Sequence, residues 1–492
     1  MYNAYITRIK NMHKHPNADR LQIGECFGNA VIVSMEYEDN QLGVYFPSDG
    51  QLSVEFAEVN NLLRKKDENG NNIGGYMDPD KRNVTAIKLR GEKSDGLFLP
   101  LKSLESFGDI TTLREGDRID NFNGHEICCK YVPRKQNRRG HYSDGNKTRK
   151  KKVPVAPLFA EHADTEQLAY NLAAFKVGDE IEITLKMHGT SQRTGYLPVF
   201  KGYHSDNRFW NRVLRTVKPE KSKFAQKLYD KAVSFATPIY DWGYVSGTRR
   251  TVLENFEGGY YGSNEFREAH SKFFEGKLNK GETAYYEVVG FTHTGAPIMA
   301  SGDNKKLNDK DFVKQYGPTT VFSYGCDPRG GEHYFAGPGH MPPVTDKPKS
   351  DIYVYRMTMT NEDGFTVEYS PDFMRYRCEQ MGVKCVPVFE KFIIPADEEL
   401  DVITSEAENV VNYEKMTCGE YVKYIAEQYY DGPDPVGKTH VREGVVVRII
   451  NRPKFCAYKH KNWFFKALSG IAVAQAEEVG VDNVSDDILS EM

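Results

Sequence analysis

The sequence lacks a long hydrophobic run. Among its 492 residues, no apolar stretch approaches the ~20 residues that span a bilayer. The first ten residues, Met1–Lys10, also lack the apolar core of a signal peptide. We therefore expect a cytoplasmic protein with no membrane partner.

Cysteine is sparse too, and the eight cysteines form no CxxC pair. Structural zinc sites usually draw on such closely spaced pairs, so no zinc site is expected. Scattered cysteines in a reducing compartment are usually free thiols. The formal net charge of -4 argues against a uniformly basic coat for nucleic acid, so any such surface has to be local.

The sequence is rich in residues of strands and turns, with 30 tyrosines, 27 phenylalanines, 42 glycines and 23 prolines. This composition favours a strand-rich and loop-rich chain. The length allows two or three domains with a core each. We predict an α+β protein that begins with a small β-barrel and continues as a larger domain.

Residues 1–127 contain short alternating runs of β-branched and apolar residues, separated by turn signals such as Asp78-Pro79-Asp80. Alternation of this kind is typical of strands. An OB-like barrel that binds nucleic acid fits the spacing, and an ordinary β-barrel is the alternative. The predicted strands are Asn3–Met12, Leu21–Phe27, Asn29–Met35, Gln41–Phe46, Arg82–Leu89 and Gly96–Pro100.

Residues 128–153 are predicted to form a flexible basic linker. Asn, Gly and Ser separate its cations, so it has no means of building a packed core. The segment is either a solvated tether or a phosphate contact with salt-dependent affinity, and both interpretations stay open. Its cations are Arg134, Lys135, Arg138, Arg139, Lys147, Arg149, Lys150, Lys151 and Lys152.

Residues 154–470 are predicted to form the larger domain, in which strands alternate with helices. The tail, 471–492, is predicted to start as a helix and to become acidic at the surface. The predicted strands are Glu180–Leu185, Thr283–Val289, Thr320–Tyr324, Ile352–Thr358, Gly444–Ile450 and Phe455–Tyr458, and the predicted helices include Lys221–Phe235 and Cys418–Tyr430.

The most informative motif is Lys186-Met-His188-Gly189, at the end of a predicted strand. A lysine there is placed to attack phosphorus, provided that its amine is neutral, although an ordinary lysine has a pKa of ~10.4. Neighbouring cations favour the neutral amine. Lys459 and Lys461 are candidates, because alternation along a strand puts both on one face, where they also neutralise phosphate charge.

Two carboxylates complete the pattern. Glu443 precedes an apolar strand and Glu287 lies within one. A carboxylate without a partner is costly among apolar neighbours, so these two are expected to have a function. We predict that Glu443 holds Mg²⁺ or Mn²⁺ against phosphate oxygens, with Glu287 as the candidate for a second ligand.

In this order the segments resemble the covalent nucleotidyltransferase superfamily of ATP-dependent DNA and RNA ligases and mRNA capping enzymes. The matching segments are Lys186–Gly189, Tyr286-Glu287, Arg442-Glu443-Gly444 and Lys459-His-Lys461. The family usually has aspartate where this chain has His188, and that departure is typical of RNA ligases that seal nicks in duplexes. The resemblance implies an ATP-grasp-like domain of antiparallel sheets and helices. It is nearest to the Deinococcus-type RNA ligase, which has an N-terminal OB domain; His15–Leu21 and Val84–Gly96 also resemble the OB modules of tRNA-binding proteins.

The resemblance also implies roles for single residues. Lys186 would carry AMP, His188 and Gly189 would lie at the nucleotide, and Glu287 would contact ribose or a metal-bound water. In Ser246-Gly-Thr-Arg249-Arg250, the arginine that contacts the nucleotide or the RNA end would be Arg249, with Arg250 as second choice. The ring that stacks on adenine would be Tyr355, with Tyr353, Phe322 and Tyr324 as rivals.

The implied activity is ATP-dependent RNA ligation. Lysyl-AMP and RNA-adenylate would be intermediates, and RNA ends with 3′-OH and 5′-phosphate, as at a nick, would be the partners. A DNA ligase, a GTP-dependent capping enzyme and a non-catalytic RNA-binding protein are the alternatives. Oligomeric state, template requirement and biological RNA are not predicted.

One motif points elsewhere and is rejected. Gly432-Pro-Asp-Pro-Val-Gly-Lys438-Thr439 satisfies the Walker A pattern. That motif functions as a loop from a strand into a helix, with backbone N–H groups around phosphate. Here a predicted helix precedes it and a strand follows, and its prolines remove donors. We predict no P-loop.

Overall fold

The protein is described here as a computed structural model, which covers residues 2–65, 74–131, 153–162, 165–253, 256, 264–299, 307, 309–318, 320–331, 345–396, 416–468 and 472–473. The nine linker cations named above and most of the predicted tail lie outside the described residues. No described helix is both long and apolar enough to cross a membrane.

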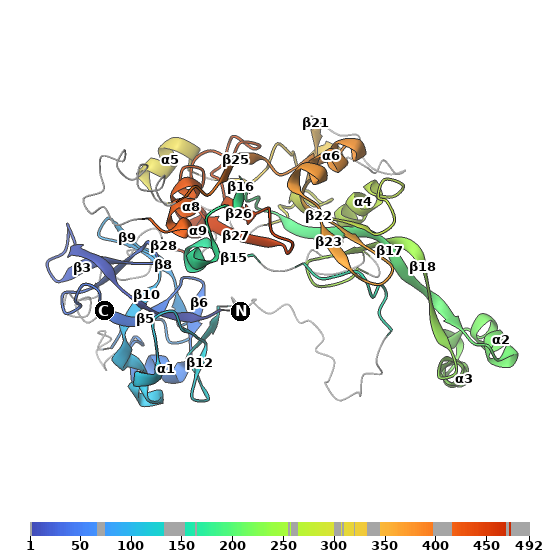
Figure 1. Cartoon of the computed structure of the whole chain (residues 1–492), viewed down its shortest axis with the longest axis horizontal. Helices are drawn as coiled ribbons and strands as arrows, with labels where there is room; N and C mark the ends of the chain where they lie inside the picture. Colours follow the sequence, from blue (N-terminus) through green and yellow to red (C-terminus); the bar gives the residue numbers. More distant parts are fainter. Residues whose placement is uncertain are drawn as a thin grey trace.

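The chain is mixed, with several small sheets and short helices, and the first 131 residues lie at one end of the molecule in Figure 1. Antiparallel pairing joins four strands in the order β10-β5-β1-β11 and three more in the order β2-β3-β4. These strands are β1 (Ala4–Arg8), β2 (Lys10–Lys14), β3 (Leu21–Cys26), β4 (Asn29–Ser34), β5 (Leu42–Phe46), β10 (Leu97–Pro100) and β11 (Arg118–Ile119).

Shorter strands and one helix complete this end. Most of the predicted strands are present, which confirms their positions, but the described pairings do not form a closed ring. The OB barrel therefore stays a prediction. The remaining elements are β6 (Gly50–Leu52), α1 (Val54–Val59), β7 (Asn83–Val84), β8 (Ala86–Leu89), β9 (Glu92–Ser94), β12 (Asn121–Phe122), β13 (His125–Glu126) and β14 (Cys128–Lys130), with β28 (Ala472–Val473) paired to β8.

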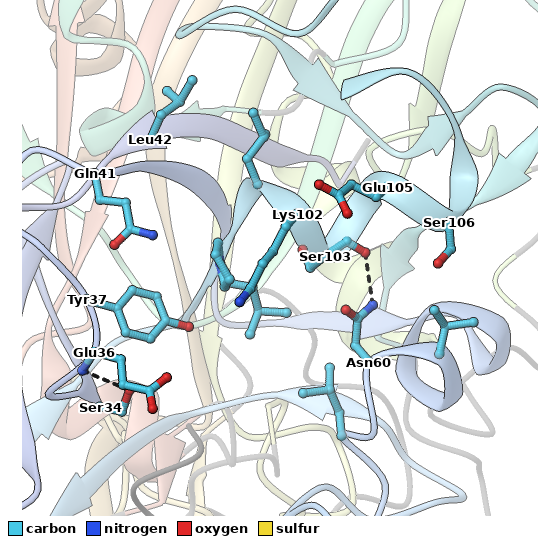
Figure 2. Close-up of a pocket in the computed structure, with 15 residues that line it drawn as sticks. Ser34, Glu36, Tyr37, Gln41, Leu42, Asn60, Lys102, Ser103, Glu105 and Ser106 are labelled. Carbon is cyan, nitrogen blue, oxygen red and sulfur yellow. Dashed lines mark hydrogen bonds between the residues drawn. The ribbon is translucent and has the colours of Figure 1, made fainter. Parts of the chain in front are cut away.

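A recess of about 660 Å³ opens in this N-terminal part. Figure 2 shows Tyr37, Gln41 and Lys102 around it, with Glu36 and Glu105 nearby. It contains none of the residues predicted to handle a nucleotide, so it plays no part in the candidate site.

Two sheets in the rest of the chain hold the predicted site. The first has five strands in the order β15-β27-β26-β16-β25, and the second runs β18-β17-β19-β22-β23, with β24 paired to β22. The strands are β15 (Glu166–Gln167), β16 (Glu180–Leu185), β17 (Thr190–His204), β18 (Thr237–Gly247), β19 (Glu282–Gly290), β22 (Ser350–Thr360), β23 (Thr366–Glu368), β24 (Lys384–Cys385), β25 (Val388–Ile393), β26 (Gly444–Ile449) and β27 (Cys456–Lys461). A small parallel pair is made by β20 (Gly330–Gly331) and β21 (Thr345–Pro348).

Helices follow from recognisable signals. In α8, Thr417 and Glu420 form a capping box; α6 starts with Pro371 after the cap Ser370 and stops at the left-handed Gly382. The helices are α2 (Arg208–Thr216), α3 (Lys223–Val233), α4 (Glu265–Phe273), α5 (Lys310–Tyr316), α6 (Pro371–Met381), α8 (Cys418–Glu427) and α9 (Trp463–Leu468).

The prediction of a strand at Thr320–Tyr324 was wrong. Residues 320–323 have no regular structure, and Tyr324 lies in a turn with a φ of 48°. The apolar pattern there reflects burial instead, since Phe322 and Tyr324 belong to the core between the two sheets. The other five strands predicted in this part exist, as do the helices at 221–235 and 418–430, with shifted ends.

The N-terminal part is docked on the rest of the chain by polar and aromatic contacts. Lys466 of α9 pairs with Asp95, and Lys88 lies 3.0 Å from Asp309. The Tyr170 ring packs against Tyr5 at a centroid distance of 4.9 Å. In this arrangement Lys130, at the end of β14, is within electrostatic reach of Lys459 of β27.

Candidate active site

Lys186 and Glu443 form the centre of the candidate site. The Lys186 Nζ lies 2.8 Å from the Glu443 Oε1, and Lys461 Nζ lies 3.6 Å from the same oxygen. The side chain of Glu443 is 4% exposed and that of Lys186 is 22% exposed, so the amine is the part of the pair that a substrate can reach.

Strand register explains why these residues meet. Leu185 pairs with Val445, and the next backbone N–H, that of Lys186, donates to the Gly444 carbonyl at 3.0 Å. Gly444 has a φ of 140°, and a Cβ there would lie 2.0 Å from the His460 carbonyl oxygen, so the position requires glycine. The carboxylate just before Gly444 is thereby held beside the end of β16.

Lys459 and Lys461 share a face of β27, as alternation predicts. In the register with β26, Lys461 pairs with Gly444 and Lys459 with Val446, which places both lysines near Lys186. Burial lowers the pKa of Lys459 to about 8, with further lowering from the charges of Lys461 and Lys186. Burial also lowers the pKa of Lys461, although Glu443 opposes that shift.

Glu443 stays charged despite its burial. Burial alone would raise its pKa, but the Lys186 ammonium, the neighbouring His188 imidazole and the charge of Lys461 hold it well below the usual value. Among the described residues, its Oε2 has no hydrogen-bond partner at normal distance. That oxygen is therefore a buried acceptor whose hydrogen-bonding capacity a cation or a water would satisfy.

His188 lies under this carboxylate. Its Nδ1 is 3.7 Å from the Glu443 Oε2, and its ring packs edge-on against Phe322 and Phe465, each at 4.8 Å. The residue is 6% exposed, and its backbone N–H donates to the Tyr324 hydroxyl at 2.6 Å. This arrangement points the imidazole at Glu443 and buries it away from solvent.

Glu287 approaches from the second sheet. It pairs with Ser191, at the start of β17. Its pKa is raised to about 7, first by burial and then by the charge of Glu443, while Lys186 and Arg249 oppose the shift. Gly189 permits the close approach, because a Cβ there would meet the Val288 carbonyl at 2.4 Å and the Glu287 side chain at 2.8 Å.

Tyr355 lies at a β-bulge of β22, where it has no pairing partner in the register with β19. Tyr285 pairs with Arg356 and Tyr286 with Val354, so Tyr355 is the extra residue. Its hydroxyl is 2.9 Å from that of Ser191, and Glu287 contributes to its raised pKa after burial. The structure thus places Tyr355 at the site.

The rival rings lie differently. Tyr353, Phe322 and Tyr324 are 5%, 3% and 2% exposed and belong to one buried core cluster with Leu185 and Met187. Of the four rings, Tyr355 is the one that is only partly buried, which leaves part of its ring accessible.

Arg249 follows β18 at the rim of the site. Its charge influences Glu287, Tyr355 and Lys459, so it lies within electrostatic reach of all three. Its backbone carbonyl accepts from the His162 N–H at 3.0 Å, which fixes the loop.

The described residues contain no cluster of three or more His, Cys, Asp or Glu side chains that would hold a metal alone. The two carboxylates Glu443 and Glu287 are electrostatically coupled instead. Mg²⁺ is commonly held by one or two carboxylates together with substrate phosphates and water, so the donor set fits such an ion. The orphaned Glu443 Oε2 is the available ligand atom.

Two site residues were missed from the sequence. Lys130, at the end of β14, is one of the charges that lower the pKa of Lys459. Arg267 is buried in α4, donates to the Thr190 hydroxyl at 2.5 Å and acts on Glu287. Neither stands in a recognisable motif, and only tertiary structure brings them to the site.

The segment 432–439 carries no P-loop, because it follows α8 and leads to β26, with Asp434 accepting from the N–H groups of Val436 and Gly437.

No protein-family model matches the chain, and no curated protein matches it either. Among solved structures it is similar to Naegleria gruberi RNA ligase with PPi, at 14% identity and a TM-score of 0.48, covering 94% of this chain and 97% of that one. A mutant of that ligase with ATP and Mn is 14% identical with a TM-score of 0.49, and the match covers 96% of this chain and 98% of that one. Another mutant, with AMP and Mn, is 13% identical with a TM-score of 0.47, and the match covers 93% of this chain and 96% of that one. Similarity at this level does not assign a function.

Proposed function

We propose that the protein is an ATP-dependent RNA ligase that joins 3′-OH and 5′-phosphate RNA ends, above all at nicks in duplexes. The observation that carries the proposal is the contact of Lys186 Nζ with the buried Glu443 Oε1, at 2.8 Å, beside Lys461 and Lys459. An accessible amine, a charged carboxylate and two further cations are what attack on a nucleotide phosphate requires.

In the first step the free amine of Lys186 attacks the α-phosphorus of ATP. A P–N bond forms, the P–O bond to the β-phosphate breaks, and pyrophosphate leaves. The amine has to lose its protons in the process, and water accepts them. Lys459 and Lys461, on the same face of β27, neutralise the charge that develops on the α-phosphate oxygens.

In the second step a 5′-phosphate oxygen of RNA attacks the same phosphorus, so the P–N bond breaks and RNA-adenylate forms. In the third step the 3′-OH attacks the 5′-phosphorus, the phosphodiester forms and AMP leaves. These are transfers at phosphorus, so the residues act mainly by positioning and charge neutralisation. We assign to Arg249, at the rim, the contact with the nucleotide or the RNA end.

The nucleoside would be held by the second sheet. We assign stacking on adenine to Tyr355 and contact with the ribose to Glu287, with Gly189 permitting close approach of the backbone. His188 is assigned an indirect role, without contact to the nucleotide, since its imidazole is buried and faces the carboxylate of Glu443. It would orient that carboxylate rather than contact the nucleotide.

Mg²⁺ or Mn²⁺ would be held by the Glu443 Oε2, with Glu287 as a possible second ligand. When bound, the ion would polarise the phosphate oxygens and lower the charge that opposes attack.

The N-terminal part, with proposed boundaries 1–127 and an OB-like fold, would contact the RNA, together with a basic linker at 128–153. The ligase domain would be 154–470.

Denaturing analysis after incubation with radiolabelled ATP and Mg²⁺ tests the proposal. Label should remain on the protein and be lost in Lys186→Ala, whereas Lys176→Ala, at an exposed lysine before β16, should keep it. Label from GTP but not from ATP would indicate a capping enzyme instead. Equal sealing of deoxyribose and ribose nicks would contradict the RNA assignment, and RNA binding without any label would indicate a non-catalytic protein.

A further inference from the structure

A two-stranded ribbon leaves the second sheet and carries two helices at its end. β17 pairs with β19 only from Thr190 to Gly195, whereas its pairing with β18 continues to His204. The partner strand takes eight steps over this length, from Val245 to Thr237, so at ~3.3 Å per residue the ribbon sets its end ~26 Å from Gly195, the last residue of β17 paired with β19. Figure 1 shows it extending away from the body of the protein, on the side opposite to the N-terminal part.

The end of the ribbon, residues 205–236, forms a small packed unit that we call the tip. The Trp210 ring stacks on that of Phe235, at 5.4 Å and 12° between planes, and Ser205 donates to the Phe235 carbonyl at 2.8 Å. Val213 and Ala232 are buried between α2 and α3. An isolated hairpin is marginally stable in water, so this core helps to keep the tip folded.

The tip has a charge opposite to that of the whole protein. It contains eight Lys and Arg and three Asp and Glu, a balance of 8 - 3 = +5, in a chain of net charge -4. All eight cations are exposed. They are Arg208, Arg212, Arg215, Lys218, Lys221, Lys223, Lys227 and Lys231.

Large apolar side chains lie among these cations. Phe224, Phe209 and Phe235 are 76%, 62% and 57% exposed. Cations that meet phosphates and aromatic rings that stack on bases are the combination that single-stranded nucleic acid recognises. An exposed aromatic cluster without function is also a liability for association.

We propose that the tip is a second RNA-contact surface, which binds the RNA that flanks the break through its phosphates and, where bases are unpaired, by stacking on Phe209 and Phe224. This rests on the proposed function, which makes RNA the substrate. β17 starts directly after Lys186–Gly189, so the ribbon ties the tip mechanically to the site of sealing. Its reach of ~26 Å matches about 8 nucleotides at ~3.4 Å each.

The charge test uses Arg212→Gln/Arg215→Gln, which removes two exposed cations of α2. The matched control is Lys310→Gln/Lys314→Gln, which removes two exposed cations of α5. Fluorescence anisotropy with RNA flanks of about 20 nucleotides, which extend past the reach of the ribbon, should show about 10-fold weaker binding for the α2 variant. Its slope of log affinity against log salt should also fall by about 1.4 to 1.8. The control variant should bind the long RNA like the wild type. With flanks of about 4 nucleotides, which end within that reach, the α2 variant should also bind like the wild type.

The stacking test uses Phe209→Ser/Phe224→Ser, at two side chains that are more exposed than buried, with far-ultraviolet circular dichroism to confirm folding. Binding of a long single-stranded flank should weaken about 10-fold, while a fully paired flank of equal length should lose less. Affinity for long RNA unchanged in both tip variants would overturn the proposal. If the tip variants lost the binding of anionic phospholipid vesicles that the wild type shows but kept their RNA affinity, the proposal would also be overturned, in favour of a membrane contact.

The self-labelling of the same variants with ATP separates the two proposals. The tip lies outside the site of lysine adenylylation, so both variants should label like the wild type. Absence of label in every protein would reject the ligase proposal, but the binding comparison would still decide on the tip. Normal label with unchanged binding of long RNA would reject the tip alone.

Discussion

The Glu443 carboxylate lies between two lysines, with its Oε1 2.8 Å from Lys186 Nζ and 3.6 Å from Lys461 Nζ. A buried carboxylate in such a position keeps its charge and holds both amines in place. It also leaves its second oxygen without a partner among the described residues. Most of the proposed chemistry depends on this one side chain.

Replacing Glu443 by Gln should therefore abolish adenylylation without unfolding the protein. The amide keeps the shape but loses the charge that binds metal, so we expect at least a 100-fold lower rate of lysyl-AMP formation. The matched control is Glu182→Gln, at a carboxylate of β16 that is 3% exposed and paired with Arg375. It should lower stability and leave the rate per folded molecule unchanged. Near-normal labelling of Glu443→Gln would remove this residue from the site.

Two carboxylates of β19 should behave in opposite ways. Glu287→Gln is expected to slow adenylylation by about 10-fold to 100-fold, with little change in melting temperature, because among the described residues Glu287 is influenced by neighbouring charges and is not held in an ion pair. Glu282→Gln should instead cost about 3 kcal/mol of unfolding free energy, because it breaks a buried pair with Arg377 at 2.8 Å. Rates and thermal melts of both variants measure this. A stability loss in the first with a normal rate would make Glu287 structural.

The pKa of about 8 at Lys459 predicts a pH dependence of ATP binding. Below that value the ammonium is charged and grips phosphate; above it the amine is neutral and the attraction is lost. ATP affinity should thus fall as pH rises through about 8. Titration calorimetry in a Lys186→Arg background keeps a cation at the nucleophile and prevents the reaction.

The control for this titration is Lys459→Arg in the same background. A guanidinium stays charged over the whole range, so the alkaline loss of affinity should disappear. The same loss of affinity in both proteins would show that another group titrates.

Tyr355 should act through its ring and not through its hydroxyl. Tyr355→Phe loses the 2.9 Å contact with Ser191 but keeps the stacking surface, so ATP affinity should change by less than about 3-fold. Tyr355→Leu should weaken ATP binding by about 10-fold or more, since stacking on a base contributes about 1–3 kcal/mol. Equilibrium binding of both variants gives the answer. Normal affinity of the leucine variant would move the stacking role to another ring.

Sequence patterns predicted the part of the site that strands determine. Lys459 and Lys461 follow alternation, and Lys186 and Glu443 meet because the ends of β16 and β26 are in register. A pattern of this kind survives folding because side-chain direction in a strand is fixed by position.

Tertiary structure decided the rest. Phe322 and Tyr324 looked like strand residues because they are apolar and aromatic, yet they fill the core from a turn. Nothing in the spacing of Arg267 or Lys130 indicates that packing of α4 and β14 brings them to the site. The ribbon was also unexpected, since only its second helix had a recognisable pattern, at 221–235.

The most direct measurement is mass spectrometry of the Lys186 peptide after the protein has been exposed to ATP and Mg²⁺. We predict the mass of one adenylyl group on this lysine, labile to acid as a phosphoramidate should be, and its disappearance when nicked RNA is added. A peptide that stays unmodified in folded protein able to bind ATP would contradict the ligase mechanism.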